Sequence, residues 1–376
     1  MNQQEIINTI ALTRLGYFSL ASMLRLYREV GSATEILQHR HDIRTILPEA
    51  SDRLVEALRQ MDDPMRRAEA EYAFDEAHKI RPIVLSDPDY PERLRQCDDA
   101  PLVIFYRGTA NLNAAHIVSI VGTRQMTSYG QELIQRFVAD LKRLLPDVIV
   151  LSGLAYGVDI CAHRAALDNG LDTIGVLAHG LDTIYPNLHR PEAERMLTQG
   201  GLLTEYLTAT KADKMNFVRR NRIVAGMADA TVLVESAAHG GGLITASIAR
   251  SYDREVFAFP GSVGAKYSEG CNQLIRQNGA VLLTSAADLL DTMGWTNELA
   301  RQQALESGIE RQMFPDLTDE ESTVVEALKR HNDLQVNMLA VQTDIPISRL
   351  VALLFSLEMK GVVRTMAGGT YHLLTL

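Results

Sequence analysis

The sequence predicts an α/β protein built on a doubly wound, mostly parallel β-sheet, with a smaller domain on each side. In the central part of the chain, short runs of β-branched and aliphatic residues alternate with amphipathic stretches of roughly 10 to 18 residues, the spacing of βαβ crossovers. These runs are hydrophobic almost throughout, which is typical of strands covered on both faces. In the two flanking regions, apolar residues recur at helical spacing instead.

Length and composition are those of an ordinary globular protein. The chain has 376 residues, 46% hydrophobic and 22% charged, which is enough for two or three domains. It contains no uninterrupted apolar stretch of the roughly 18 residues that a membrane helix needs. Residues 1–10 are polar and acidic, unlike a signal peptide, so we expect a cytoplasmic protein with no membrane partner.

The cysteines and the net charge narrow the possible functions. Cys97, Cys161 and Cys271 lie far apart, which predicts reduced thiols rather than a disulfide framework or a zinc site. The net charge of −10 argues against a protein that coats nucleic acid through bulk positive charge. Any contact with nucleic acid must therefore come from a local basic cluster.

Residues 1–75 are predicted to form a small helical domain of the SAM-like or helix-hairpin-helix-like type. A turn at Gly16 interrupts the helical spacing, which continues from Leu20 to Tyr27 before Gly31, and Ser32 begins another helical segment. A further helical stretch at residues 54–58 ends near Pro64. Short helices around glycine turns can form DNA-binding hairpins, although they more often serve only as packing units.

Residues 76–292 are predicted to form the sheet domain. Two strands precede its first βαβ unit, so we expect an extended Rossmann-like domain. The strand candidates are residues 82–85, 102–106, 117–121, 148–151, 173–177, 202–205, 231–234, 256–259 and 281–283.

The C-terminal part is predicted to be a winged-helix-like domain at residues 316–376, after a polar linker at residues 293–315. Thr318 precedes an acidic first turn, which predicts a helix start. A second amphipathic helix follows at residues 347–359, and a hairpin with a glycine turn at residues 368–369 comes after it.

Candidate binding residues follow the strands, because ligands bind open parallel sheets at the carboxyl ends of the strands. The first such loop, V-G-T-R, contains Gly122, Thr123 and Arg124 just before a helix. A glycine, a helix N-terminus and an arginine together suit a phosphate. The dinucleotide fingerprint G-x-G-x-x-G is absent, so no nicotinamide or flavin cofactor is expected.

The loop after the next parallel strand reads S-G-L-A-Y-G-V-D and begins with Ser152 and Gly153. A direct ligand contact and a purely structural strand-to-helix turn fit this loop about equally well. Asp159 is interpreted as a helix cap rather than an acid catalyst. His163, one turn further on, is interpreted as a hydrogen-bonded structural histidine, since no second ligand lies at metal-binding spacing.

Residues 211–222, K-A-D-K-M-N-F-V-R-R-N-R, hold five basic residues and one acid. Backbone phosphates bind cations, and an unstacked base binds a flat apolar ring. A helix cannot place three arginines and an asparagine from four consecutive positions on one side, so part of this run must be structural or solvated. The candidate residues are Lys214, Phe217, Arg219, Arg220, Asn221 and Arg222.

Gly240 and Gly241 belong to a third glycine-rich loop, H-G-G-G-L-I-T-A, which fits either an anion site or a tight turn. The sequence contains no Walker lysine, no Ser/His/Asp order and no H-E-x-x-H motif. We therefore expect neither an enzyme nor a metal or cofactor site.

Taken together, these loops resemble the DNA-processing protein A family (DprA, also called Smf). The motifs follow one another in the family's order through the predicted Rossmann-like domain. They are V-G-T-R at 121–124, S-G-L-A-Y-G-V-D-I-C-A-H at 152–163, H-G-L-D-T-I-Y-P at 179–186, F-V-R-R-N-R-I-V-A-G at 217–226, H-G-G-G-L-I-T-A at 239–246, F-P-G-S at 259–262 and G-C-N-Q-L-I at 270–275.

The resemblance implies a homodimer that binds single-stranded DNA without cleaving it. It further implies a role in natural transformation and recombination, in which the protein protects incoming strands and helps to load the RecA recombinase. The strand-binding residues that it implies are Arg124, Lys214 and Phe217, with Arg219, Arg220, Asn221 and Arg222 as the adjoining motif.

The chain departs from the family pattern in three places. Val218 stands where the family commonly has proline, and Gly16 is followed by Tyr17 rather than completing a G-x-G turn. DNA contact by the helical domain is therefore left open. The predicted recognition helix of the C-terminal domain offers only Arg349 and Lys360 as cations, so we expect that domain to contact protein.

Two other functions compete with strand binding. A Rossmann-type phosphoribohydrolase would use a P-G-G-x-G-T-x-x-E loop, but here H-G-G-G-L-I-T-A ends in Ala246 and no glutamate follows in register. A structural scaffold with a relic pocket is the other alternative. Base release from a nucleotide would favour the first of these, and an absence of strand binding would favour the second.

Overall fold

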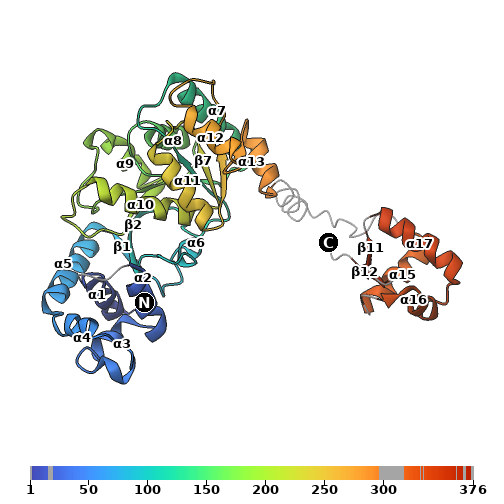
Figure 1. The fold of residues 1–376 in the computed structure, drawn as a ribbon, viewed down its shortest axis with the longest axis horizontal. Helices are drawn as coiled ribbons and strands as arrows, with labels where there is room; N and C mark the ends of the chain where they lie inside the picture. Colours follow the sequence, from blue (N-terminus) through green and yellow to red (C-terminus); the bar gives the residue numbers. More distant parts are fainter. Residues whose placement is uncertain are drawn as a thin grey trace. The chain divides into compact units, whose positions relative to one another are not determined.

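The computed structural model describes residues 2–15, 20–295, 317–330, 332, 334–360, 362–366 and 370–373. The chain divides into two compact units, Met1–Met293 and Gly294–Leu376 (Figure 1). The domain boundaries at residues 75, 292 and 315 remain predictions. The predicted turn at Gly16, residues 296–315 of the predicted linker and the predicted glycine turn at residues 368–369 lie outside the described residues.

The described part of the first unit contains a nine-stranded sheet, and its order is β1-β2-β6-β5-β4-β3-β7-β8-β9. Only the pairs β1–β2 and β2–β6 are antiparallel; the other neighbours in this sheet are parallel. The extended, mostly parallel sheet is thus confirmed, with its two additional strands at one edge. The strands are β1 (Arg81–Val84), β2 (Val103–Gly108), β3 (Ile117–Val121), β4 (Ile149–Ser152), β5 (Thr173–Val176), β6 (Gly200–Thr204), β7 (Ala230–Leu233), β8 (Glu255–Ala258) and β9 (Val281–Leu282).

The central strands form because every position on them is apolar or small enough to be covered on both faces. All five residues of β3 are buried, and β4 and β7 pair with it in parallel. The chain passes from β3 to β4 on one side and later returns to β7 on the other. The topological switch point, where such sheets bind ligands, therefore lies at the carboxyl end of β3.

Helices cover both faces of the sheet (Figure 1). On one face α7 (Ser128–Leu144) packs against α8 (Val158–Asp168) and α13 (Ala286–Thr292), and on the other α10 (Lys214–Met227) packs against α11 (Gly241–Ser251). Thr127 caps α7, and Asp213 caps α10 by accepting a 2.9 Å hydrogen bond from the Asn216 amide. The shorter helices of this domain are α6 (Glu92–Arg95), η2 (Asn187–His189), α9 (Arg190–Met196) and α12 (Glu269–Arg276).

The N-terminal helices share a hydrophobic core with the antiparallel edge of the sheet. Ile10, Leu24 and Leu58 are buried in one cluster with Phe105 of β2. Their common core means that the helices and the sheet belong to the same compact unit. The elements are α1 (Gln3–Leu12), α2 (Leu20–Val30), α3 (Ala33–Gln38), η1 (Ile43–Thr45), α4 (Asp52–Arg59) and α5 (Asp62–His78).

Helix α5 was not predicted, since the sequence was interpreted as ending its last helical stretch near Pro64. Pro64 instead lies in the first turn of α5, where a missing backbone N–H breaks no helical hydrogen bond. The buried face of α5 consists of Ala68, Glu71 and Asp75 rather than large apolar residues, so hydrophobic periodicity does not reveal it.

The buried carboxylate of Glu71 ties α5 to the loop after β6. Glu71 forms an ion pair with Arg67, with 2.7 Å between Nη1 and Oε2, and accepts hydrogen bonds from the Thr208 amide at 2.8 Å and the Thr208 hydroxyl at 2.5 Å. Burial, together with the charge of Glu71, raises the pKa of Asp75 to about 8. The N-terminal helices are thereby held against the segment that leads into α10.

The second unit is a small α/β domain with a three-stranded sheet in the order β10-β12-β11 among its described residues. The two predicted helices are α15 (Asp319–Arg330) and α17 (Ile347–Met359), and the two hairpin strands are β11 (Val363–Met366) and β12 (Thr370–Leu373). The strand β10 (Leu334–Gln335) and the helix α16 (Val336–Thr343) were not predicted.

No single helix among the described residues is long and apolar enough to cross a membrane. By length and composition alone, α16 and α17 would meet that test only as a pair, and they meet at an angle of 106°. Leu350, Leu354 and Leu357 of α17 are buried in the core of the second unit.

Candidate nucleic-acid interface

A cavity of about 630 Å³ lies at the switch point of the sheet. The loops after β3, β4, β5 and β7 line it, together with one face of α10 and the first turns of α11. It brings together ten residues that the sequence predicted for strand binding. They are Gly122, Thr123, Arg124, Gly153, Lys214, Phe217, Arg220, Asn221, Gly240 and Gly241.

The aromatic ring of Phe217 lies at the centre of a cationic cluster. The guanidinium carbon of Arg124 is 4.8 Å from the ring centroid, and that of Arg220 is 5.9 Å away. The ring of Tyr185 is tilted beside it at a centroid distance of 5.9 Å. The cavity therefore offers a flat apolar surface with positive charge next to it.

Tyr185 was not among the predicted site residues, although it belongs to the H-G-L-D-T-I-Y-P motif. The imidazole Nε2 of His179 accepts a hydrogen bond from the Tyr185 amide at 3.2 Å. The other ring nitrogen of His179 donates to the Gly180 carbonyl at 2.9 Å, which fixes the tautomer. The buried histidine thus positions an exposed ring whose role the motif alone does not indicate.

Arg220 lies at the floor of the cavity and is only 3% exposed. Its guanidinium donates hydrogen bonds to the carbonyls of Gly153, at 2.7 Å, and Val176. Burial lowers the pKa of Arg220, and the nearby carboxylate of Asp159 opposes this effect. A Cβ on Gly153 would come within 2.3 Å of the guanidinium nitrogens, so the close approach requires glycine at this position.

Two residues outside the prediction hold the loop that carries Arg124. Glu235, buried directly after β7, accepts hydrogen bonds from the Thr127 amide at 2.8 Å and the Thr127 hydroxyl at 2.5 Å. Gly157 has a φ of +77°, and a Cβ there would lie 2.3 Å from the Thr123 carbonyl oxygen. An acid that directly follows a buried strand was the available signal for Glu235.

Ser152 and His163 are structural in this geometry. The buried Ser152 hydroxyl donates to the Ile120 carbonyl at 2.6 Å and links β4 to β3. His163 is fully buried, with 2.7 Å between its Nδ1 and the Thr173 hydroxyl. Burial lowers the pKa of His163 to about 3, so the ring is neutral at physiological pH. Neither residue lines the cavity.

The interpretation of Asp159 as a helix cap is wrong. Gly157 is the N-cap of α8 and no side chain caps the helix; Asp159 lies in its first turn, accepts a hydrogen bond from the Ala155 amide at 3.4 Å and lines the cavity. Burial raises its pKa, and the charge of Arg220 lowers it. Among the described residues, no group of three or more His, Cys, Asp or Glu side chains is arranged to hold a metal ion.

The basic run on α10 divides between opposite sides of the helix. Lys214, Phe217 and Asn221 face the cavity, because residues three, four and seven apart share one helical face. Arg222 is 5% exposed and pairs with the buried carboxylate of Glu205. Arg219 is exposed and lines a different cavity, so neither arginine reaches the one at the switch point.

The cations of the predicted recognition helix are engaged within their own unit. Arg349 pairs with Glu320 at 2.8 Å, and Lys360 pairs with Glu321 at 2.7 Å. Burial raises the pKa of Glu321, but hydrogen bonds from Lys360, Thr318 and Ser356 together lower it to about 2. The two cations of α17 therefore neutralise acids of α15.

Comparison with known protein families gives two matches. Residues 81–294 match the family "DNA recombination-mediator protein A", and residues 312–369 match the "DprA winged helix domain". The winged-helix prediction for the C-terminal part is thereby confirmed.

Curated relatives cover most of the chain. The protein Smf of Escherichia coli is 31% identical over 363 residues, which are 95% of each chain. A putative DNA processing protein DprA of Mycobacterium tuberculosis is 36% identical over 278 residues, covering 73% of this chain and 70% of the relative. The DNA processing protein DprA of Streptococcus pneumoniae is 35% identical over 225 residues, 58% of this chain and 78% of the relative.

Two solved structures are similar in fold. The X-ray structure of DNA processing protein A from Streptococcus pneumoniae has a TM-score of 0.65 and 31% identity, and covers 75% of this chain and 95% of that one. The Helicobacter pylori protein, whose structure is described in terms of its single-stranded DNA binding mode, has a TM-score of 0.52 and 24% identity. It covers 57% of this chain and 95% of that one, and at this identity it supports the fold alone.

Replacing Arg222 should destabilise the protein far more than replacing Arg219. The Arg222→Ala substitution leaves Glu205 buried without its partner, which costs about 3–5 kcal/mol of unfolding free energy. Arg219→Ala removes an exposed side chain and should change it by less than about 0.5 kcal/mol. Urea denaturation of the two variants measures the difference.

A double substitution tests whether the unpaired charge of Glu205 causes the loss of stability in Arg222→Ala. Arg222→Met combined with Glu205→Leu removes both buried charges and should recover most of the stability. Equal costs for Arg219→Ala and Arg222→Ala would contradict the assignment of Arg222 to the interior and of Arg219 to the surface.

Proposed function

Because this chain belongs to the DNA recombination-mediator protein A family, we propose that it binds single-stranded DNA, without cleaving it, in the cavity at the switch point. It acts in natural transformation and recombination, protects incoming strands and helps to load the RecA recombinase. The Helicobacter pylori relative is described as binding single-stranded DNA. The proposed strand contacts are the predicted residues that line this cavity.

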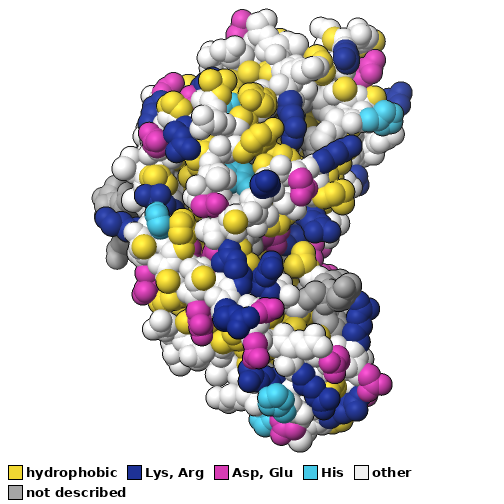
Figure 2. All heavy atoms as spheres, turned by 90° about the vertical axis from the view of Figure 1, so that its left-hand side faces the viewer, with side chains coloured by type: hydrophobic (Ala, Val, Ile, Leu, Met, Phe, Trp, Pro, Cys, Tyr) yellow, Lys and Arg dark blue, Asp and Glu magenta, His cyan; other side chains and the backbone are white. Residues whose placement is uncertain are grey.

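The observation that carries this proposal is the pair of unpaired cations beside Phe217. Arg124 and Lys214 are exposed, and the cationic group of neither forms an ion pair or a hydrogen bond with another described residue. In a chain of net charge −10, most other arginines of the sheet domain are paired or buried. Figure 2 shows a face of the molecule with a notch in its outline, where Lys and Arg side chains gather with some Asp and Glu side chains among them.

The preference for single strands follows from the aromatic surface. A base stacks on a ring such as Phe217 only when it is unpaired, and each such stack is worth about 1–3 kcal/mol. Phosphates are held by Arg124, Lys214 and the backbone amides of the glycine loops. Contacts of this kind bind without reading the base sequence, so little sequence specificity is expected.

A role without catalysis fits the same geometry. A phosphoribohydrolase loop would be followed by a glutamate beside the ribose. Here the corresponding loop ends at Ala246, which is fully buried in α11. His163 is neutral and lies away from the cavity, so it offers no proton at this site. Release of a free base from a nucleoside monophosphate by the purified protein would contradict this part of the proposal.

Removing the two unpaired cations should abolish most of the strand binding. For Arg124→Ala combined with Lys214→Ala, we expect at least a ~10-fold loss of affinity for labelled oligo-dT, measured by fluorescence anisotropy. The slope of log affinity against log salt should flatten by about 1.4, because two phosphate contacts disappear. Phe217→Ala should lower the affinity by about 1–3 kcal/mol and leave the slope unchanged.

The matched control removes two positive charges elsewhere. Arg59 and Arg276 are exposed, and Arg59→Ala with Arg276→Ala should bind like the wild type. Arg349→Ala should also leave the affinity unchanged, because we propose that the C-terminal domain contacts protein rather than the strand. Equal losses in the cavity variant and the charge control would place the DNA elsewhere.

Loading of the recombinase is the finer part of the proposal. RecA should assemble faster on oligo-dT covered by a single-strand-binding protein when this protein is present, and the Arg124→Ala/Lys214→Ala variant should not accelerate it. Light scattering or strand exchange measures the rate. Wild-type protein that binds the strand but leaves the assembly rate unchanged would overturn RecA loading while strand binding stands.

We also propose that the chain is cytoplasmic. Its recovery in the membrane fraction of cells would contradict this location.

The proposed homodimer has a candidate contact at the outer edge of the sheet. Strand β9 pairs only with β8 among the described strands, and its Val281 and Leu282 are 39% and 47% exposed. An uncovered apolar edge strand is a surface that another chain can cover. We expect Leu282→Arg to turn dimers into monomers in sedimentation experiments, whereas Val263→Arg, at a 99% exposed position, should not. A monomeric wild type would contradict the dimer.

A further inference from the structure

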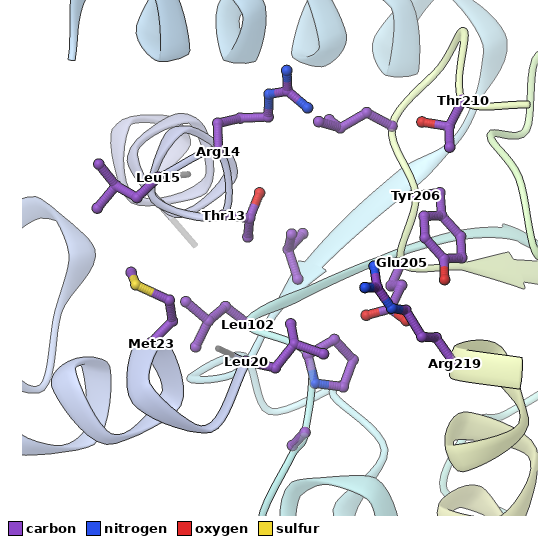
Figure 3. A pocket seen from close by; sticks show the side chains of 14 residues that line it. Thr13, Arg14, Leu15, Leu20, Met23, Leu102, Glu205, Tyr206, Thr210 and Arg219 are labelled. Carbon is purple, nitrogen blue, oxygen red and sulfur yellow. The ribbon is translucent and has the colours of Figure 1, made fainter. Parts of the chain in front are cut away.

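A second cavity, of about 480 Å³, lies on the other side of α10 (Figure 3). Its walls come from the end of α1, the start of α2, the segment before β2, the loop after β6 and Arg219 of α10. Arg14 and Arg219 extend from opposite walls, with Tyr206 and Thr210 on the side of the β6 loop (Figure 3). Leu102 and Met23 form part of an apolar floor.

The two arginines of this cavity are available for an anion. Arg14 and Arg219 are exposed, and the guanidinium group of neither forms a hydrogen bond or an ion pair with any described residue. Glu205 is the acid among the lining residues; the buried Arg222 pairs with it, and the charge of the nearby Arg219 also favours its ionised form (Figure 3). The two guanidinium groups thus outnumber the one acid of the cavity and provide ten donors for phosphate oxygens, five from each.

The second cavity adjoins the first across the N-terminal end of α10. Thr210 lines the second cavity, whereas Asp213 and Lys214 line the first. Lys211, between them, is exposed, and its ammonium group forms no hydrogen bond or ion pair with a described residue, although its backbone carbonyl accepts a hydrogen bond from the Asn216 side chain at 3.2 Å. Met215 is 59% exposed on the first turn of the helix. Unpaired cations therefore continue from one cavity to the other around a helix about 10–12 Å in diameter.

The walls of the second cavity are held in a fixed arrangement. Glu71 of α5 accepts two hydrogen bonds from Thr208, and Arg67 donates to the Thr208 carbonyl at 2.9 Å. The loop that carries Tyr206 and Thr210 is thereby fastened to the N-terminal helices, from which Arg14 extends. The backbone segments that carry Arg14 and Arg219 are thereby held in place, so a ligand that contacts both orders only their side chains on binding.

We propose that the second cavity continues the path of the bound strand. A single strand whose phosphates lie beside Arg124 and Lys214 passes the end of α10 at Lys211, and its next phosphates contact Arg219 and Arg14. The N-terminal helices thus take part in strand binding through Arg14 and need no glycine hairpin of their own. This inference rests on the proposed function, because it extends the site at the switch point.

The test compares Arg14→Ala/Arg219→Ala with Arg124→Ala/Lys214→Ala on oligo-dT strands of different length. A strand of about 4 nucleotides fills one cavity only, and one of about 15 nucleotides spans both. The Arg14/Arg219 variant should bind the short strand like the wild type and lose about 10-fold on the long one. Its salt slope on the long strand should flatten by about 1.4. The Arg124/Lys214 variant should lose affinity for both strands.

Each remaining outcome is decisive. The second contact is overturned if the Arg14/Arg219 variant binds the long strand as tightly as the wild type while the Arg124/Lys214 variant binds it weakly. The proposed function stands in that case. Wild-type binding by both variants overturns the proposed site itself. An equal loss on short and long strands shows that the arginines act on the first cavity, which also overturns the continued path.

Two further variants test whether the loss of affinity comes from the position of the charges rather than from a lower total charge. Arg14→Lys/Arg219→Lys keeps both charges and should retain most of the affinity for the long strand. Arg59→Ala/Arg276→Ala removes the same number of charges outside both cavities and should bind both strands like the wild type. The thermal midpoint of the Arg14→Ala/Arg219→Ala variant should equal that of the wild type, since neither side chain is buried.

Discussion

The candidate site depends on the buried guanidinium of Arg220. A buried cation is costly unless hydrogen bonds and an opposite charge compensate for its lost hydration. Here the carbonyls of Gly153 and Val176 accept from it, and Asp159 lies close enough to favour its charged form. Because these partners lie at the ends of two neighbouring strands and on α8, one side chain holds three walls of the cavity together. Phe217, one turn earlier on the same helix, takes its position from that anchor.

Some cations of α10 are buried and others are exposed, which explains how an acidic protein can present a local positive surface. The helix buries Arg220 and Arg222, which satisfy carbonyls and Glu205, and exposes Lys214 and Arg219. The buried arginines fix the helix against the sheet, and only the exposed cations remain for a ligand. The negative charges elsewhere on the chain reduce non-specific attraction to duplex DNA, so binding depends on the few places where cations lack acidic partners.

Much of the fold and of the candidate site could be predicted from the sequence, because the strands are buried on both faces and the loops that follow them carry recognisable residue types. The nine strand candidates and the loops at Gly122, Gly153 and Gly240 followed from that pattern. Helix α5 did not, because its buried face uses the polar residues Glu71 and Asp75 in place of an apolar stripe. Arg219 and Arg222 could not be assigned to their surroundings either. Helical periodicity shows that the side chains of consecutive residues point in different directions, but only the packing of α10 decides which of them are buried.

The attachment of Thr208 to Glu71 has a consequence for how the chain can vary. The segment between β6 and α10 is held at Thr208, and Asp213 caps the helix only five residues later. Insertions or deletions in this segment would rotate α10 or release its cap, so its length is constrained although it is a surface loop. Loops attached at neither end, by contrast, tolerate changes of length at little cost. A family alignment should therefore show a gap-free stretch here, maintained by the geometry of one carboxylate rather than by contact with any ligand.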